Sequence, residues 1–94
     1  MIKYGGKKVV SVVREENWAI PAERIRIFFR QQSDVTETET GFVFRQCSIR
    51  LTPLSGQLLG KWQQQRTLIT LKGPEADTEE IYNRFFLRFL SAGG

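Results

Sequence analysis

The sequence predicts an α+β domain, in which a four-stranded antiparallel β-meander is followed by a C-terminal amphipathic helix packed on one face (ββββα). Two observations lead to this fold class. Apolar and polar residues alternate over much of residues 7–72, as in strands with one buried face. After Gly73-Pro74, large apolar residues recur at helical spacing. The chain has 94 residues, so we expect a single globular domain spanning 1–94.

The strands are expected where β-branched and aromatic residues alternate with polar ones, at residues 7–14, 23–31, 42–52 and 61–72. A helix is possible for 23–31, but the same enrichment favours a strand. One face should be buried and carries Ile25, Ile27, Phe29, Val43, Cys47, Ile49, Leu51, Thr67, Ile69 and Leu71. Phe42 and Phe44 are expected on the other face, unless a bulge near Arg45-Gln46 changes the alternation.

The connections are polar. Residues 15–22 contain Pro21 and are interpreted as a loop that tucks Trp18 and Ile20 against the core. Residues 32–41 form a polar connection in which the Thr/Glu alternation could extend a strand into an exposed ribbon.

The C-terminal helix has clear start and stop signals. Asp77 with Glu80 fits a capping box, and Gly93 suits a C-terminal cap. The apolar stripe, expected to pack on the sheet, consists of Ile81, Tyr82, Phe85, Phe86, Phe89 and Leu90. On the opposite face Glu80, Arg84 and Arg88 follow one another at a spacing of four residues, which favours ion pairs along the helix.

The charge distribution gives the main indication of function. The net charge is +4, and no acidic residue lies between Glu39 and Glu75, so a positive surface could attract phosphates or an acidic partner. One helix can cover only one face of the sheet, which leaves the other for binding. The candidate binding residues on that face are Arg24, Arg26, Phe28, Arg30, Phe42, Phe44, Arg50, Trp62 and Arg66.

Three hypotheses fit these residue types. The first is a non-catalytic binding or assembly module whose partner is another protein or a second copy, with Phe28, Phe42 and Phe44 buried in a sheet-to-sheet homodimer. The second is single-stranded DNA or RNA binding, because arginines meet phosphates and aromatic rings stack on bases. In the third, the strand curls and the aromatic residues join one continuous core.

Catalysis is not expected. The chain has no histidine, which removes the usual general bases and ordinary zinc sites. Cys47 in strand phase with Ile49 is interpreted as a small buried hydrophobe. No cofactor, metal site or small-molecule substrate is predicted. The terminal Gly93-Gly94 pair also ends ubiquitin-like sulfur carriers, but a helix cap or frayed end explains it better.

The sequence predicts a cytoplasmic protein. Cys47 is the only cysteine, whereas small secreted domains are usually cross-linked by several disulfides. No apolar run has the length of a signal peptide or a membrane span.

Overall fold

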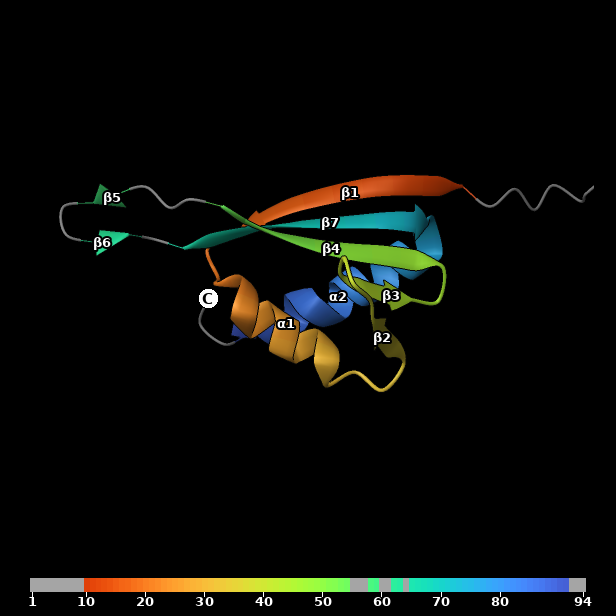
Figure 1. Ribbon diagram of the computed structural model, residues 1–94. Helices are drawn as coiled ribbons and strands as arrows, with labels where there is room; N and C mark the ends of the chain where they lie inside the picture. Colours follow the sequence, from red (N-terminus) through yellow and green to blue (C-terminus); the bar gives the residue numbers. More distant parts are fainter. Residues whose placement is uncertain (1–9, 55–57, 60–61, 64, 92–94) are drawn as a thin grey trace, which may run out of the picture.

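The computed structural model describes residues 10–54, 58–59, 62–63 and 65–91. Its main sheet has five antiparallel strands in the order β1-β7-β4-β3-β2, and both helices lie on one face of it (Figure 1). The sheet strands are β1 (Ser11–Trp18), β2 (Val35–Glu37), β3 (Phe42–Phe44), β4 (Cys47–Leu54) and β7 (Arg66–Pro74), and the helices are α1 (Ala22–Arg30) and α2 (Glu75–Ser91). The predicted class, an α+β fold with an antiparallel sheet and a C-terminal helix, is confirmed. The predicted four-stranded meander (ββββα) is wrong, because the sheet has five strands, β1 lies beside β7 and not beside β2, and a second helix precedes β2.

A separate hairpin projects beyond the main sheet. Its strands, β5 (Leu58–Leu59) and β6 (Trp62–Gln63), pair with each other and lie past the ends of β4 and β7 (Figure 1). The predicted strand over 61–72 therefore consists of β6 and most of β7. Its inward residues Thr67, Ile69 and Leu71 are buried, as predicted.

The prediction of a strand over 23–31 is wrong, because these residues form α1. Ile25 and Phe29 lie on one face in a strand and also in a helix, so the alternation of apolar residues could not distinguish a strand from a helix. The third buried residue of this segment distinguishes them. Phe28 is buried while Ile27 is 46% exposed, and a helix places residues 25, 28 and 29 on one face, whereas a strand would place 25, 27 and 29 there. Pro21 stands at the N-cap with extended backbone, and its carbonyl accepts the first hydrogen bond, from Arg24 N.

The predicted strand over 42–52 is interrupted by a two-residue turn. Arg45 and Gln46 connect β3 to β4, and Phe44 pairs with Cys47 across the hairpin. Paired residues share a face, so Phe42 and Phe44 lie with Cys47 and Ile49 in the core. The expected placement of both phenylalanines on the opposite face is therefore wrong, and Val43, expected on the buried face, points there. The stated exception applies, because the alternation does change at Arg45-Gln46, through a turn and not through a bulge.

The element boundaries also differ from those predicted. Strand β1 runs through Trp18, into the expected loop of 15–22. The polar connection over 32–41 contains the short strand β2. Helix α2 begins directly after β7, at Glu75. Asp77 therefore lies within the first turn of the helix, and the prediction that it is the N-cap is wrong. Gly93 lies outside the described residues.

The core is an aromatic cluster between the sheet and the two helices. Phe85 of α2 is at its centre, with ring centroids 4.9 Å from both Trp18 and Phe89. Phe28 and Phe29 of α1 contact the same ring at 6.2 Å. The predicted helix stripe is thus largely confirmed: Ile81, Tyr82, Phe85 and Phe89 are buried, Phe86 is partly buried and Leu90 is 56% exposed.

Candidate binding surface

The face of the sheet opposite the helices is covered by neither of them, and we call it the uncovered face. Side chains alternate between the two faces along each strand, and the buried residues of β4 and β7 identify the helix side. The remaining positions define the uncovered face: Val13, Glu15 and Asn17 of β1, Val43 of β3, Ser48, Arg50, Thr52 and Leu54 of β4, and Arg66, Leu68, Thr70 and Lys72 of β7.

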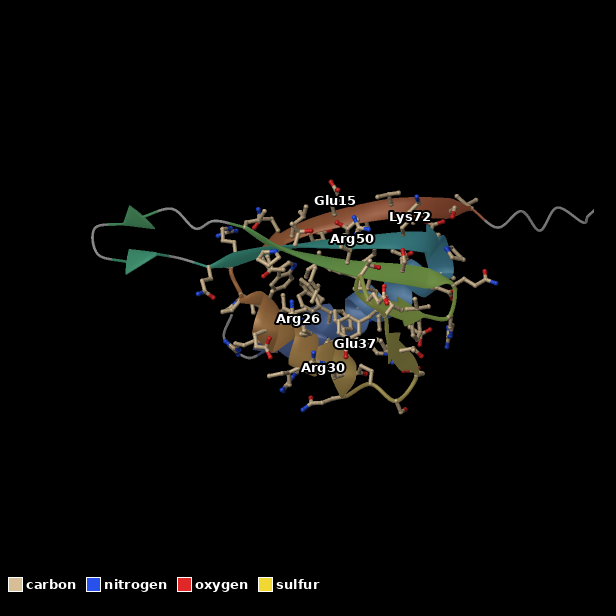
Figure 2. All side chains as sticks on the ribbon, in the orientation of Figure 1. Glu15, Arg26, Arg30, Glu37, Arg50 and Lys72 are labelled. Carbon is tan, nitrogen blue, oxygen red and sulfur yellow. The ribbon has the colours of Figure 1, made fainter. Side chains whose placement is uncertain are left out.

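Two exposed cations are neighbours on the uncovered face, Arg50 near the middle of β4 and Lys72 toward the end of β7. Arg50 pairs with Thr70, and Ser48 pairs with Lys72, so Arg50 and Lys72 are diagonal neighbours on adjacent strands. Figure 2 shows them on the same side of the sheet as Glu15, and shows Arg26, Arg30 and Glu37 on the helix side. Within the part of the chain that the structure describes, neither Arg50 nor Lys72 has a carboxylate partner.

A third cation, Arg66, lies at the end of this face. Its Nε donates a hydrogen bond to Asn17 Oδ1 at 2.8 Å. The contact fixes the guanidinium group but does not neutralise it, because the amide is uncharged. Hydroxyl groups of Ser48, Thr52 and Thr70 lie among the cations along β4 and β7. This face therefore offers cations and hydrogen-bond donors together.

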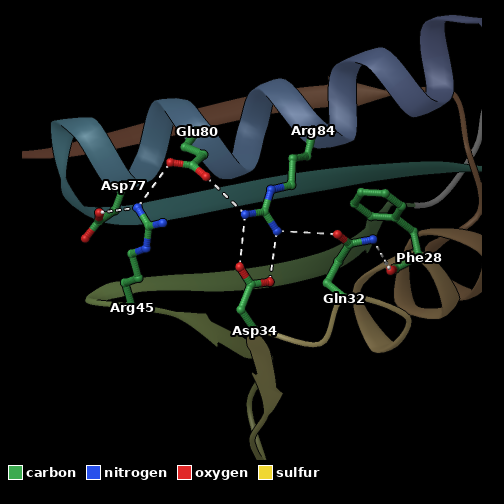
Figure 3. A network of polar contacts seen from close by, with 7 residues as sticks. All are labelled: Phe28, Gln32, Asp34, Arg45, Asp77, Glu80 and Arg84. Atoms are coloured by element: carbon green, nitrogen blue, oxygen red, sulfur yellow. Dashed lines mark hydrogen bonds and ion pairs between the residues drawn. The ribbon is translucent and has the colours of Figure 1, made fainter.

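On the other side of the molecule, several carboxylates form ion pairs with arginines. Arg84 of α2 donates from Nη1 and Nη2 to the two oxygens of Asp34, each at 2.9 Å, and from Nη2 to Glu80 at 3.0 Å (Figure 3). Arg45 in the β3–β4 turn contacts Glu80 at 3.1 Å and Asp77 at 3.6 Å. The hydrogen bonds from Arg84 hold the pKa of Asp34 and Glu80 below their usual values.

Similar pairs occur on α1 and along the helix-facing side of β1. Arg30 donates to both oxygens of Glu37, at 3.0 and 3.1 Å, and this lowers the pKa of Glu37. Arg26 contacts Glu23 at 2.7 Å. Arg14 and Glu16 of β1, whose side chains alternate away from the uncovered face, pair at 2.8 Å. Arg24 of α1 is also exposed and has no carboxylate partner among the described residues, but only Arg50 and Lys72 combine this condition with neighbouring positions on one sheet face.

The structure separates the predicted binding residues into four groups. Arg50 and Arg66 lie on the uncovered face, as predicted. The arginines of α1, which are Arg24, Arg26 and Arg30, lie in the helix layer on the opposite side. The three phenylalanines, Phe28, Phe42 and Phe44, are buried in the core. Their burial agrees with the third hypothesis. Trp62 belongs to β6, and its side chain lies outside the described residues.

The prediction missed Lys72 as a site residue. The alternation that placed Thr67, Ile69 and Leu71 inward also places Lys72 on the other face, so the signal was present. The hydroxyl residues Ser48, Thr52 and Thr70 were missed because small polar residues are common on any exposed strand.

Cys47 is fully buried, as predicted. Burial raises the pKa of the thiol, and Thr78 Oγ1 donates to its sulfur at 3.6 Å. A buried thiol with a raised pKa does not act as a nucleophile.

Comparison of the chain with known protein families, with curated proteins and with solved structures gives no match. Within the described ranges, His, Cys, Asp and Glu side chains nowhere gather in a group of three or more that could hold a metal ion. No helix formed by the described residues is long and apolar enough to cross a membrane.

Proposed function

We propose that this protein is a non-catalytic binding module, and that its uncovered face binds the phosphate backbone of a single-stranded nucleic acid. One observation carries the proposal: Arg50 and Lys72 are exposed side by side on one sheet face, without carboxylate partners among the described residues. Cations in this condition attract an anion without first having to break an internal ion pair.

The surrounding groups suit phosphate oxygens. Hydroxyl groups of Thr52 and Thr70 can donate hydrogen bonds to phosphates, as such side chains do in many nucleic-acid complexes, whereas the Ser48 hydroxyl donates to Lys72 O at 3.3 Å. Arg66 can donate from the nitrogens that its contact with Asn17 leaves free. Together they line β4 and β7, the two adjacent strands that carry all three cations of this face.

The expected mode of binding differs from base stacking. The described residues of the uncovered face include no aromatic side chain, since Phe42 and Phe44 are in the core. Recognition through phosphates alone carries little sequence information. We therefore expect weak, salt-sensitive binding with little preference among sequences.

A protein partner is less well supported on this face. Its apolar residues, Val13, Val43, Leu54 and Leu68, stand in different strands and alternate with polar positions, so they form no continuous apolar centre of the kind found in stable interfaces. A face-to-face homodimer would also bury cations without partners, which is costly. An acidic protein surface is the remaining alternative, and the experiment below separates it from nucleic acid.

The test is titration of a fluorescently labelled single-stranded oligonucleotide with the protein, followed by anisotropy at low and at physiological salt. We expect binding at low salt that weakens as salt rises, with a slope of about 0.7 per phosphate contact in a plot of log affinity against log salt. Reversing a charge on the uncovered face, by Arg50→Glu or Lys72→Glu, should weaken binding and lower this slope.

Arg24→Glu is the matched control, because it makes the same charge change on α1 in the opposite layer. Equal weakening by Arg24→Glu and Arg50→Glu would contradict the assignment of the face. Absence of binding by the unaltered protein at low salt would remove nucleic acid as the ligand. Competition by an acidic polypeptide as strong as that by the unlabelled oligonucleotide would favour an acidic protein partner.

A further inference from the structure

Strand β1 has a neighbour on one side only. It pairs with β7 along its full length, and it is the edge of the sheet in the described residues. At eight residues it is as long as the central strand β4, whereas β2 at the opposite edge has three. A long free edge presents unpaired backbone groups to a further strand.

The backbone groups that face outward from β1 can be identified. Glu75 N donates to Val10 O at 2.9 Å, so the hydrogen-bonded pairs with β7 fall on even-numbered residues of β1. Pro74, which has no N–H, stands opposite Ser11, as this alternation requires. The N–H and C=O groups of the odd-numbered residues, Ser11, Val13, Glu15 and Asn17, therefore point away from β7.

The charges of β1 are arranged for pairing with a copy of itself. Arg14 and Glu16 lie on the helix side of the sheet with one residue between them, and Glu15 lies on the uncovered face. When two such strands run antiparallel with a two-fold axis at Glu15, Arg14 of each copy stands opposite Glu16 of the other. We propose that the protein forms a homodimer by pairing of β1 with β1 of a second copy in this register.

The register follows from two conditions. Residues paired across the axis must lie on the same face of the joined sheet, so the pairing can shift only in steps that keep even residues opposite even ones. Moving the axis to residue 14 sets Arg14 against Arg14, and moving it to residue 16 sets Glu16 against Glu16. An axis at residue 15 brings opposite charges together twice and also sets Val12 opposite Trp18.

The strand geometry strengthens these pairs. The outward hydrogen-bonding groups belong to odd residues, so Arg14 and Glu16 of the two copies would form non-hydrogen-bonded pairs, in which side chains approach most closely. Arg14 is already oriented: its guanidinium group lies 4.0 Å from the centroid of the Tyr82 ring, and its Nε donates to Glu16.

Space for a second strand exists on the helix side of this edge. An open groove of about 720 Å³ is lined by Arg14 together with residues of α2, including Tyr82, Asn83 and Phe86. The helix-side residues of an added β1 strand would lie over this groove. The two-fold axis would be perpendicular to the sheet, so the uncovered faces of both copies would lie on the same side.

Glu15 limits the strength of the dimer. It would face Glu15 of the second copy directly, and like charges directly opposite each other in a sheet are destabilising. We expect a reversible dimer whose population depends on protein concentration. The repulsion between the two Glu15 side chains gives a specific test. Glu15→Gln should tighten the dimer, whereas a substitution that damages the fold would weaken it.

Sedimentation velocity over a concentration series, without nucleic acid, measures the association. We expect Glu15→Gln to tighten the dimer by about two- to five-fold, the change that removal of one such repulsion gives. Arg14→Glu should weaken it about ten-fold or more, and Arg14→Glu combined with Glu16→Arg should restore it. Val13→Pro removes an outward N–H without touching the ladder to β7, and should abolish the dimer.

Thermal melts of the same variants show whether each is folded. A monomer at every concentration, or a dimer that Glu15→Gln leaves unchanged, would overturn the proposal. A dimer that survives Val13→Pro in a folded variant would place the interface elsewhere and overturn it too. The result is independent of the proposed ligand, because oligonucleotide binding by Arg50 and Lys72 is measured separately.

Discussion

Arg84 joins α2 to the connection before β2, because its Nη1 and Nη2 donate to both carboxylate oxygens of Asp34, each at 2.9 Å. The same guanidinium group contacts Glu80 one turn earlier in α2, and Glu80 contacts Arg45 in the β3–β4 turn (Figure 3). Two connections that precede α2 by 50 and 35 residues at these contacts are thus held to one helix.

This network predicts a loss of stability in acid. The pKa of Asp34 lies below its ordinary value of 3.8 in the folded protein because Arg84 donates to it. A lowered carboxyl pKa stabilises the folded state above the unfolded pKa, and the contribution disappears as pH falls through the folded pKa. Asp34→Asn should therefore lower the melting temperature at pH 7, and the difference from the unaltered protein should shrink as the pH falls below the ordinary carboxyl pKa of 3.8.

Thermal melts followed by circular dichroism from pH 7 to 2 measure this effect. Glu39→Gln is the control, because Glu39 is exposed and has no ion-pair partner among the described residues. A constant difference between Asp34→Asn and the unaltered protein at every pH would show that the ion pair is not its cause.

Phe85 should be the most sensitive core position on α2. Its ring is 1% exposed and contacts aromatic residues from β1, α1 and α2. Phe85→Ala should lower the free energy of unfolding by about 3–5 kcal/mol, which is enough to unfold many small domains. Leu90→Ala on the same helix removes a side chain that is 56% exposed, and urea unfolding should detect a change of only about 0.5 kcal/mol.

Arg45 has a backbone conformation that suits glycine. Its φ is 55°, in the left-handed region where other residues are disfavoured by about 1–2 kcal/mol. Arg45→Gly and Arg45→Ala both remove the contacts to Asp77 and Glu80, but only glycine relieves the strain. The glycine variant should be the more stable of the two by about 1 kcal/mol in urea unfolding. Equal stability would mean that the turn tolerates alanine without strain.

Cys47 should be protected from thiol reagents in the folded state. Its side chain is buried, and its pKa is raised by burial, so both access and thiolate formation are hindered. Reaction with a chromogenic disulfide should be slow in buffer and fast in denaturant. Rapid reaction in buffer by a protein with an unchanged melting temperature would contradict the burial of Cys47.

The parts of the fold that could be predicted from sequence are those with long, unambiguous periodicity. Phe85 and Phe89 continue a stripe over several helical turns, and Thr67, Ile69 and Leu71 alternate within a long strand. The nine residues of α1 are too few to show an unambiguous period, since the spacing of Ile25 and Phe29 fits the period of a helix and also that of a strand. A bulge was considered at Arg45-Gln46, but the turn itself could not be recognised because it contains neither Gly nor Asn, the residues that usually mark such turns.

The same reasons explain the outcome for the candidate site. Arg50 and Arg66 were placed correctly because their strands were, and their role in binding stays a prediction. Phe28 was misplaced with α1. Phe42 and Phe44 were misplaced by the unrecognised turn, because it changes which face the following residues share.

In the described part of the chain, charge is separated between the uncovered face and the rest of the domain, which gives this part an electric dipole along the sheet normal. Four of the fourteen cations, Lys3, Lys7, Lys8 and Lys61, lie outside the described residues, so the described part holds ten cations and ten carboxylates. The uncovered face holds three of those cations, Arg50, Arg66 and Lys72, against Glu15 alone, and the remainder is therefore acidic. In the field of a polyanion the described part of the molecule would turn before contact, so that this face leads and the acidic residues Asp34, Glu37 and Glu39 point away.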